Sequence, residues 1–318
     1  MADGTQPMAL QMAPWPFNAN TESDFILVTV DSIYFYVHKL LLSLVSPVFK
    51  SMFTLPPDES QEVYDGRPCV KLADTSKSLL LLLSWCDPRC VARSVDLDDL
   101  QLALELADKY GMETVMKHLE TSMIGMKDTI SARPVVMYAI AARFRLENLA
   151  HAAAKVTLKT TFEELATTFI PETRHITGLC FISLLKYHRA CATEAVNAAK
   201  NFDWLRRDNQ DVIFFTFSCP RGNSCSTTER ANQLWKSWWL KYMDAVAVLL
   251  AAAPSSSVSD IEFIANFNTE ISKGGCQPCC QGGHKKLAVF AKKMSKEIKT
   301  RISSVKDISS AVPVDNID

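Results

Sequence analysis

Residues 24–55 read DFILVTVDSIYFYVHKLLLSLVSPVFKSMFTL, and this stretch decides the fold of the first part of the chain. Residues 25–30 form an unbroken apolar and β-rich run, and residues 33–37 alternate Tyr with other apolar side chains. From Leu40 onward the apolar residues recur at helical spacing. Pro47 has no N–H group to donate, so one helix should end and the next begin there. The stretch therefore predicts a β-hairpin followed by a helical hairpin.

This order of elements resembles the opening of a BTB/POZ domain. The resemblance rests on Asp24 before the first strand, the Asp31-Ser32 turn, a second strand ending in Val37-His38-Lys39, and the closing Phe49, Met52 and Phe53. It implies that Asp24 and His38 are structural positions that tie the strand to the helix, although their residue types alone would also allow an acid–base pair. It also implies an α+β domain that binds other proteins and performs no chemistry.

Composition sets the outer bounds. A chain of 318 residues predicts about two domains, and a net charge of −1 argues against a chain-wide nucleic-acid or membrane binder. No segment has the ~18 uninterrupted apolar residues of a membrane span. The first residues carry an acid and no basic run, so they do not read as a secretory signal. We therefore expect an intracellular protein, cytoplasmic or nuclear, whose ten cysteines are thiols or metal ligands.

The sequence divides into four parts. Residues 1–18 are rich in Pro, Met and Gln and are predicted to be disordered. Residues 19–126 are the BTB/POZ-like unit, residues 127–308 carry helical periodicity throughout, and residues 309–318 are a flexible tail. The predicted fold class is an α+β BTB/POZ domain followed by an all-α C-terminal domain.

The C-terminal part resembles a group of fungal BTB-domain proteins. The resemblance rests on VMYAIAARF at residues 136–144, ITGLCFISLLKYHRAC at residues 176–191, and paired cysteines beside a Trp-Trp helix. It covers most of residues 17–305. It implies a fold and says little about function.

Two close cysteine pairs carry the strongest chemical signal. They are Cys219 with Cys225, and Cys276 with Cys279, each in a turn that contains Pro or Gly. Two helices are predicted between the pairs, at residues 228–252 and 260–272, and helices that run in opposite directions would bring the second pair back to the first. Four thiolates complete a closed tetrahedral shell, so we predict one structural zinc ion.

Three alternatives belong to that prediction. Cys280 could replace Cys279, and His284 could replace a weak ligand of the first pair. The pairs could also be reduced surface thiols in two loops.

Other candidates are weaker. His188 and Cys191 share a helix face, which allows a thiolate–imidazolium nucleophile or a packed Cys beside a hydrogen-bonded His. Cys86 and Cys90 have a permissible zinc spacing but no second pair nearby, which favours a core position. The lysines of residues 285–306 lie off the apolar stripe of the last helix, so they indicate a solvated face more than a phosphate-binding one.

These observations predict a non-catalytic interaction protein of the BTB type. One hypothesis is an adaptor for a cullin-type ubiquitin ligase; the alternative is a transcriptional or chromatin regulator, and a Cys/His enzyme is less favoured. The expected partners are proteins, including a second BTB copy or a cullin, and neither a membrane nor a nucleic acid. Phe53 and Leu55, at the end of the helical hairpin, are the predicted protein-binding residues, with Leu55 the exposed contact.

Overall fold

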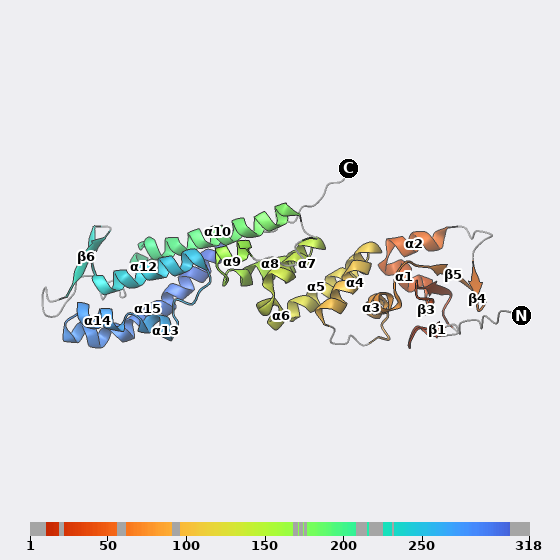
Figure 1. The fold of residues 1–318 in the computed structure, drawn as a ribbon, viewed down its shortest axis with the longest axis horizontal. Helices are drawn as coiled ribbons and strands as arrows, with labels where there is room; N and C mark the ends of the chain where they lie inside the picture. The colour runs from red at the N-terminus through yellow and green to blue at the C-terminus, as the bar shows by residue number, and fades with distance from the viewer. Residues whose placement is uncertain are drawn as a thin grey trace, which may run out of the picture. The chain divides into compact units, whose positions relative to one another are not determined.

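The computed structural model describes residues 11–18, 22–55, 62–90, 96–167, 171, 174, 177–207, 215, 225–230 and 232–305. The chain forms two compact units, residues 1–127 and residues 128–318, called here the N-terminal unit and the helical unit. Strands and helices mix in the first, and helices dominate the second (Figure 1).

The N-terminal unit is built on a five-stranded mixed sheet. Its strands are β1 (Gln11–Met12), β2 (Phe25–Val28), β3 (Ile33–Val37), β4 (Val63–Tyr64) and β5 (Arg67–Lys71), in the spatial order β1-β3-β2-β5-β4. β2 and β3 form the predicted antiparallel hairpin, in which Leu27 lies opposite Phe35, and β5 runs parallel to β2 on its other side. Because β2 is a central strand, all four of its residues are buried, which explains its unbroken apolar run.

Five helices complete the described part of this unit. They are α1 (Lys39–Val45), α2 (Pro47–Thr54), α3 (Ser76–Cys86), α4 (Leu97–Lys109) and α5 (Glu113–Gly125). Pro47 is the first residue of α2, as predicted. The Ser46 hydroxyl accepts from the Phe49 N–H at 3.0 Å and donates to the Tyr110 carbonyl at 2.6 Å. The helical hairpin is thereby fixed to the end of α4, where the Phe49 ring stacks on the Tyr110 ring.

Asp74 is a second buried anchor of the N-terminal unit. Its carboxylate accepts from the Tyr110 hydroxyl and pairs with Lys109 Nζ at 2.7 Å, while its carbonyl accepts from the Val30 N–H at 3.0 Å. Burial, followed by the hydrogen bond to Asp74, raises the pKa of Tyr110 far above its ordinary value. The hydroxyl therefore stays protonated and keeps donating to Asp74.

The prediction that residues 1–18 are disordered is wrong for the part that the structure describes. β1 pairs in parallel with β3 at Ile33 and Tyr34, and the Ala13 N–H donates to the Tyr34 carbonyl at 2.9 Å. Phe17 is buried, with its ring centroid 6.1 Å from that of Phe35. The edge of β3 offers unpaired backbone groups, and the segment satisfies them despite its disorder-prone composition. Residues 1–10 and the predicted tail, residues 309–318, lie outside the described residues.

The helical unit begins at the boundary helix α6 (Lys127–Ala132) and ends with the longest helix, α15. Its other described helices are α7 (Pro134–Arg143), α8 (Glu147–Thr157), α9 (Phe162–Thr167), α10 (Gly178–Lys200), the 3-10 helix η2 (Asp203–Arg207), α12 (Ser237–Ala252), α13 (Ile261–Ala265), α14 (Asn268–Gly274) and α15 (Gln277–Ser304). In Figure 1, α10, α12 and α15 lie side by side, and α10 packs against both of the others. Aromatic rings fill the space between α12 and α15, where Trp239 and Phe290 lie 5.6 Å apart.

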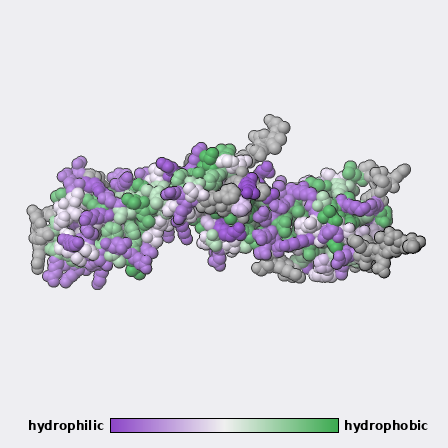
Figure 2. All heavy atoms as spheres, viewed as in Figure 1, coloured by the Kyte–Doolittle hydropathy of each residue, from purple (hydrophilic) through white to green (hydrophobic). Residues whose placement is uncertain are grey.

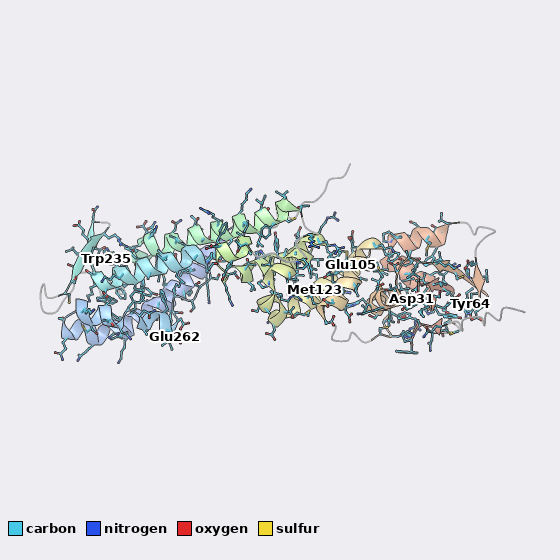
Figure 3. The ribbon with its side chains drawn as sticks, viewed as in Figure 1. Asp31, Tyr64, Glu105, Met123, Trp235 and Glu262 are labelled. Carbon is cyan, nitrogen blue, oxygen red and sulfur yellow. The ribbon has the colours of Figure 1, made fainter. Side chains whose placement is uncertain are left out.

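A short β-hairpin departs from the all-helical expectation. β6 (Thr227–Arg230) pairs antiparallel with β7 (Gln233–Lys236), and α12 starts at Ser237, whereas the sequence predicted a helix from residue 228. Asn232 has a φ of 58°, the left-handed conformation that tight hairpin turns need. The Trp235 indole N–H donates to the Arg230 carbonyl at 3.0 Å and so links β7 to β6. Figure 3 labels Trp235, which lies just before the start of α12.

Candidate functional site

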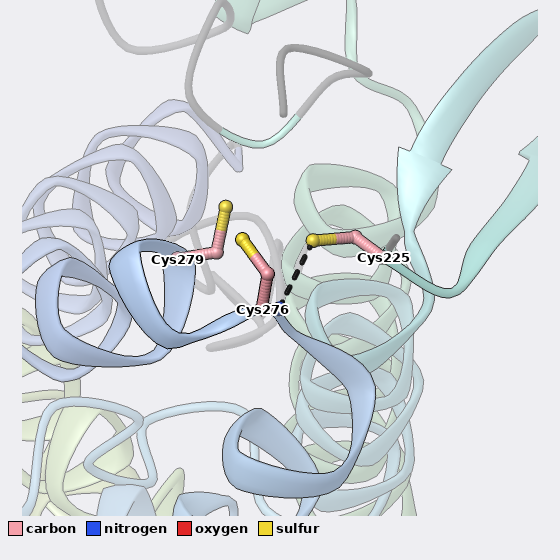
Figure 4. A group of neighbouring side chains, drawn as sticks. All are labelled: Cys225, Cys276 and Cys279. Atoms are coloured by element: carbon pink, nitrogen blue, oxygen red, sulfur yellow. Dashed lines mark hydrogen bonds between the residues drawn. The ribbon is translucent and has the colours of Figure 1, made fainter. Parts of the chain in front are cut away.

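Three cysteines of the helical unit come together. The Sγ atoms of Cys225, Cys276 and Cys279 all lie within 4.8 Å of one another, close to the ~4 Å that tetrahedral ligands of one ion require (Figure 4). Cys225 and Cys279 are buried, and Cys276 is half-buried. These three residues, called the thiol cluster, belong to both predicted pairs and could hold a metal ion.

The start of α15 positions two of the sulfurs. Cys276 is the N-cap residue, Pro278 occupies the first turn, and Cys279 follows three residues after Cys276 on the same side of the helix. Gly275 makes the tight connection from α14. A Cβ atom there would meet Cys280 Sγ at 3.0 Å and the Ile271 carbonyl at 3.2 Å. The glycine therefore allows the two helices to join beside the cluster.

The third sulfur comes from the chain just before β6. The Cys276 N–H donates to Cys225 Sγ at 3.3 Å, the dashed line in Figure 4. Next to it, the Ser226 N–H donates to the Gly274 carbonyl at 2.9 Å. Two segments separated by about fifty residues are thus joined by backbone and sulfur hydrogen bonds before any ion is considered.

The electrostatic setting of the thiol cluster is mixed. Burial is the largest cause of a raised pKa for the Cys279 thiol, and Cys276 adds to the rise. Cys225, through a hydrogen bond, and Lys236, through its positive charge, act in the opposite direction. The amino end of a helix also favours a thiolate. A divalent cation would deprotonate the thiols outright, because coordinating sulfur binds as thiolate.

The remaining sequence-predicted ligands are placed differently. Cys219 lies outside the described residues. Cys280 Sγ hydrogen-bonds to the carbonyls of Ile271 and Gly275, each at 3.1 Å, and does not join the cluster. His284 Nδ1 lies 2.7 Å from Asn268 Oδ1. Neither Cys280 nor His284 therefore stands in for a cluster cysteine.

One residue of this site escaped the sequence analysis. Lys236 is buried at the junction of β7 and α12. The sequence did contain a signal for this burial. Lys236 lies in the segment Trp235-Lys236-Ser237-Trp238-Trp239, and a lysine between large apolar residues that are usually buried is itself a candidate for burial.

The candidate nucleophile pair, His188 and Cys191, lies in a buried setting that disfavours charged groups. His188 is fully buried, its Nε2 lies 3.0 Å from the Thr160 carbonyl, and burial lowers its pKa. Burial raises the pKa of Cys191 to about 11. Both shifts oppose a thiolate–imidazolium pair, and the positions favour the packed interpretation.

Cys86 is a half-buried thiol at the end of a helix. It is the last residue of α3, its Sγ donates to the Leu82 carbonyl at 3.4 Å, and burial raises its pKa to about 12. In α15 the six lysines between residues 285 and 299 are exposed, opposite the buried stripe of Leu287, Phe290, Met294 and Ile298. That arrangement is the solvated face that the sequence favoured.

In the N-terminal unit, the predicted structural residues Asp24 and His38 lie at the start of the helical hairpin, and the predicted protein-binding residues Phe53 and Leu55 lie at its end. The Asp24 carboxylate accepts from the Lys39 N–H at 2.8 Å, and His38 is the N-cap residue of α1. Phe53 is half-buried, with its ring centroid 4.8 Å from that of Phe25. Leu55, directly after α2, is 70% exposed.

Comparison with known families settles the nature of this unit. Residues 16–127 match the model of the BTB/POZ domain. The N-terminal unit is a BTB/POZ domain. The match begins just before the buried Phe17 and ends at Lys127, so it covers the sheet from β2 to β5 and α1 to α5. A search of curated proteins gave no match to the chain.

BTB domains are interaction modules that bind proteins and mediate oligomerisation, and they are generally non-catalytic. In the described part of the chain, no helix is long and apolar enough to cross a membrane. None of the nine cysteines that the structure describes forms a disulfide.

Proposed function

We propose that the protein is a non-catalytic interaction protein that self-associates through its BTB domain and presents its helical unit to a second partner. The observation that carries this proposal is a set of exposed apolar side chains on the helical hairpin, called the hairpin face. It consists of Leu40, Leu44 and Val48. Figure 2 shows apolar residues among the polar ones on the side of the BTB domain in view.

The residues of the hairpin face come from two consecutive helices, α1 and α2. Leu40 and Leu44 are four apart on α1 and therefore lie on one side of that helix, and Val48 lies in the first turn of α2. Leu44 is 73% exposed. Apolar side chains gathered at the surface mark interaction sites, and oligomerisation is a property of BTB domains. A second copy of the BTB domain is the occupant that we propose.

Light scattering on the full chain after gel filtration tests self-association. We expect a dimer for the wild type and a monomer for Leu44→Glu, because a buried carboxylate without a partner opposes association. Val248→Glu is the matched control, since Val248 on α12 is equally exposed at 73%. A monomeric wild type, or a Leu44→Glu variant that remains dimeric, contradicts the proposal.

We also propose that the protein is an adaptor for a cullin-type ubiquitin ligase and that Leu55 and Phe53 contact the cullin. Support comes from the exposed position of Leu55 after α2 and from the BTB assignment. Affinity purification of the tagged full chain should recover a cullin that Leu55→Glu fails to recover. Recovery of chromatin proteins with no cullin would favour the alternative, a transcriptional or chromatin regulator.

We further propose that the thiol cluster holds one structural zinc ion, with Cys219 as the fourth ligand. Soft thiolates select zinc, and four protein ligands leave no open position for chemistry. Metal analysis of the purified full chain should give about one zinc per chain. Cys219→Ser should weaken zinc binding and Cys280→Ser should not, because the Cys280 sulfur is engaged with backbone carbonyls. Equal affinities for the two variants would remove Cys219 from the site.

A further inference from the structure

Lys236 is a buried cation whose position needs an explanation. Its side chain is 1% exposed and is among the largest fully buried side chains that the structure describes. Taking an ammonium group out of water costs several kcal/mol unless an opposite charge accompanies it. Lys236 is also the N-cap residue of α12, where the positive end of the helix adds to that cost.

The β6–β7 hairpin places Lys236 beside the thiol cluster. Lys236 pairs with Thr227, which follows Cys225 by two residues. The Ser237 N–H, one residue further, donates to the Ser226 carbonyl at 3.0 Å, so the start of α12 lies against the chain that carries the Cys225 sulfur. The positive charge of Lys236 favours the thiolate form of Cys279, at the start of α15. Lys236 therefore lies beside the segment that supplies Cys225, and its charge acts on a thiol of the other segment.

The charge of a metal–thiolate centre matches this arrangement. A zinc ion with three thiolates carries one net negative charge, and with four it carries two. An anionic centre with two buried sulfurs also costs free energy to bury, and a cation at short range offsets part of that cost. We propose that Lys236 is the buried counter-charge of the zinc–thiolate centre, a positioning residue that stabilises the metal-bound state. This inference rests on the zinc site proposed above.

Metal titration of the full chain tests the role of Lys236. Cobalt(II) serves as the spectroscopic probe, since its sulfur-to-metal absorption reports thiolate ligation, and zinc competition then gives the affinity. We expect Lys236→Met to weaken zinc binding about 10- to 100-fold, the range seen for residues that support metal ligands. Lys236→Arg should recover most of the affinity because it keeps the charge. The control is Lys241→Met, which removes an exposed charge of α12 that pairs with Glu270.

Three results separate the inference from the zinc proposal. Wild-type affinity in Lys236→Met overturns the role of Lys236 while the zinc site stands. A loss that Lys236→Arg does not rescue shows a packing role and also overturns it. A wild type that binds neither cobalt nor zinc removes the zinc site and the inference together.

A double-mutant cycle covers the case in which Lys236→Met folds poorly. In the zinc-loaded wild type, Lys236→Met should lower the melting temperature. In a Cys276→Ser, Cys279→Ser background, which has no anionic centre, the same change should have a clearly smaller effect, because the centre that the lysine stabilises is then absent. Equal effects in both backgrounds would mean that Lys236 acts independently of the thiols and would contradict the inference.

Discussion

The two units each contain a close cysteine pair, and the pairs end up in opposite environments. In the BTB domain, Cys86 closes α3 and its thiol is bonded to a carbonyl of its own helix. In the helical unit, Cys276 opens α15, and its sulfur meets those of Cys279 and Cys225. Sequence spacing distinguishes the pairs only slightly, since three residues separate one pair and two separate the other.

The end of the helix makes the difference. A helix presents free carbonyl groups at its carboxyl end, so a thiol there donates a hydrogen bond and stays protonated. At the amino end, free N–H groups and the positive end of the dipole favour a thiolate. A cysteine pair is therefore a stronger metal candidate at the start of a helix than at its end, and a third sulfur from elsewhere in the chain strengthens the case.

The largest expected contrast is in thiol reactivity. Burial raises the pKa of Cys86 to about 12, so at pH 8 about one thiol in 10⁴ is ionised, and that fraction rises about tenfold for each added pH unit. After zinc is removed with a chelator, Cys276 should react with iodoacetamide at pH 8 at least about tenfold faster than Cys86, because its larger thiolate fraction outweighs the lower nucleophilicity of a less basic thiolate. Peptide mapping by mass spectrometry measures both rates in one sample. Similar rates for the two cysteines would contradict the contrast between helix ends.

The next contrast is in stability. Cys279→Ser removes a buried sulfur of the thiol cluster and should abolish zinc binding. With zinc at a thousand times its dissociation constant, the lost binding energy is about 4 kcal/mol, and the transition of the helical unit should fall by about 10 °C. Differential scanning calorimetry with metal analysis measures both effects. Cys90→Ser in the BTB domain is the control and should keep the zinc; a Cys279→Ser variant that keeps its zinc would contradict the site.

The BTB domain should depend on polar packing instead of a metal. Tyr110→Phe deletes the hydroxyl that donates to the buried Asp74 carboxylate. Leaving a buried acceptor with one partner fewer should lower the free energy of unfolding by about 1–3 kcal/mol. Denaturant unfolding with and without a zinc chelator checks this, and the loss should be the same in both conditions. A chelator-dependent loss would mean that the two units do not differ in the way we describe.

The sequence predicted most elements of the fold because their signals are local. The β2–β3 hairpin, the Pro47 break and the helical periodicity after residue 127 each rest on neighbouring residues, and the structure has the hairpin, the break and a mainly helical second unit. β1 could not be predicted, since its two residues gain their strand conformation only from the edge of β3, about twenty residues away. The β6–β7 hairpin was missed because Trp235, Trp238 and Trp239 also fit a helical stripe.

The distinction between local and tertiary signals also explains which residues of the candidate site could be predicted from the sequence. Cys276 and Cys279 lie in a Pro-containing turn before a helix, a local pattern that indicates a metal knuckle. Cys225 joins them because α12, α13 and α14 return the chain to the start of α15. The position of Lys236 depends on the β6–β7 register and on burial, which are tertiary properties that no spacing in the sequence reports.

The smallest expected effect on stability distinguishes binding from folding at Leu55, the end of the helical hairpin. Leu55 follows α2 and is mostly exposed, so Leu55→Glu should change the free energy of unfolding by no more than about 0.5 kcal/mol. The same variant should lose most of the partner recovered in a pull-down. Thermal melts and quantitative immunoblots of matched samples give the two numbers. If Leu55→Glu lowered the free energy of unfolding as strongly as it lowered partner recovery, Leu55 would be a core residue and the prediction would be wrong.

The most direct test of the account is X-ray absorption at the zinc edge on the purified full chain. The account predicts about one zinc per chain with a first shell of sulfur at about 2.3 Å, three of the sulfurs coming from Cys225, Cys276 and Cys279. The Cys276→Ser, Cys279→Ser variant should show no ordered sulfur shell. A wild type without zinc, or one whose zinc is surrounded only by oxygen and nitrogen, would contradict it.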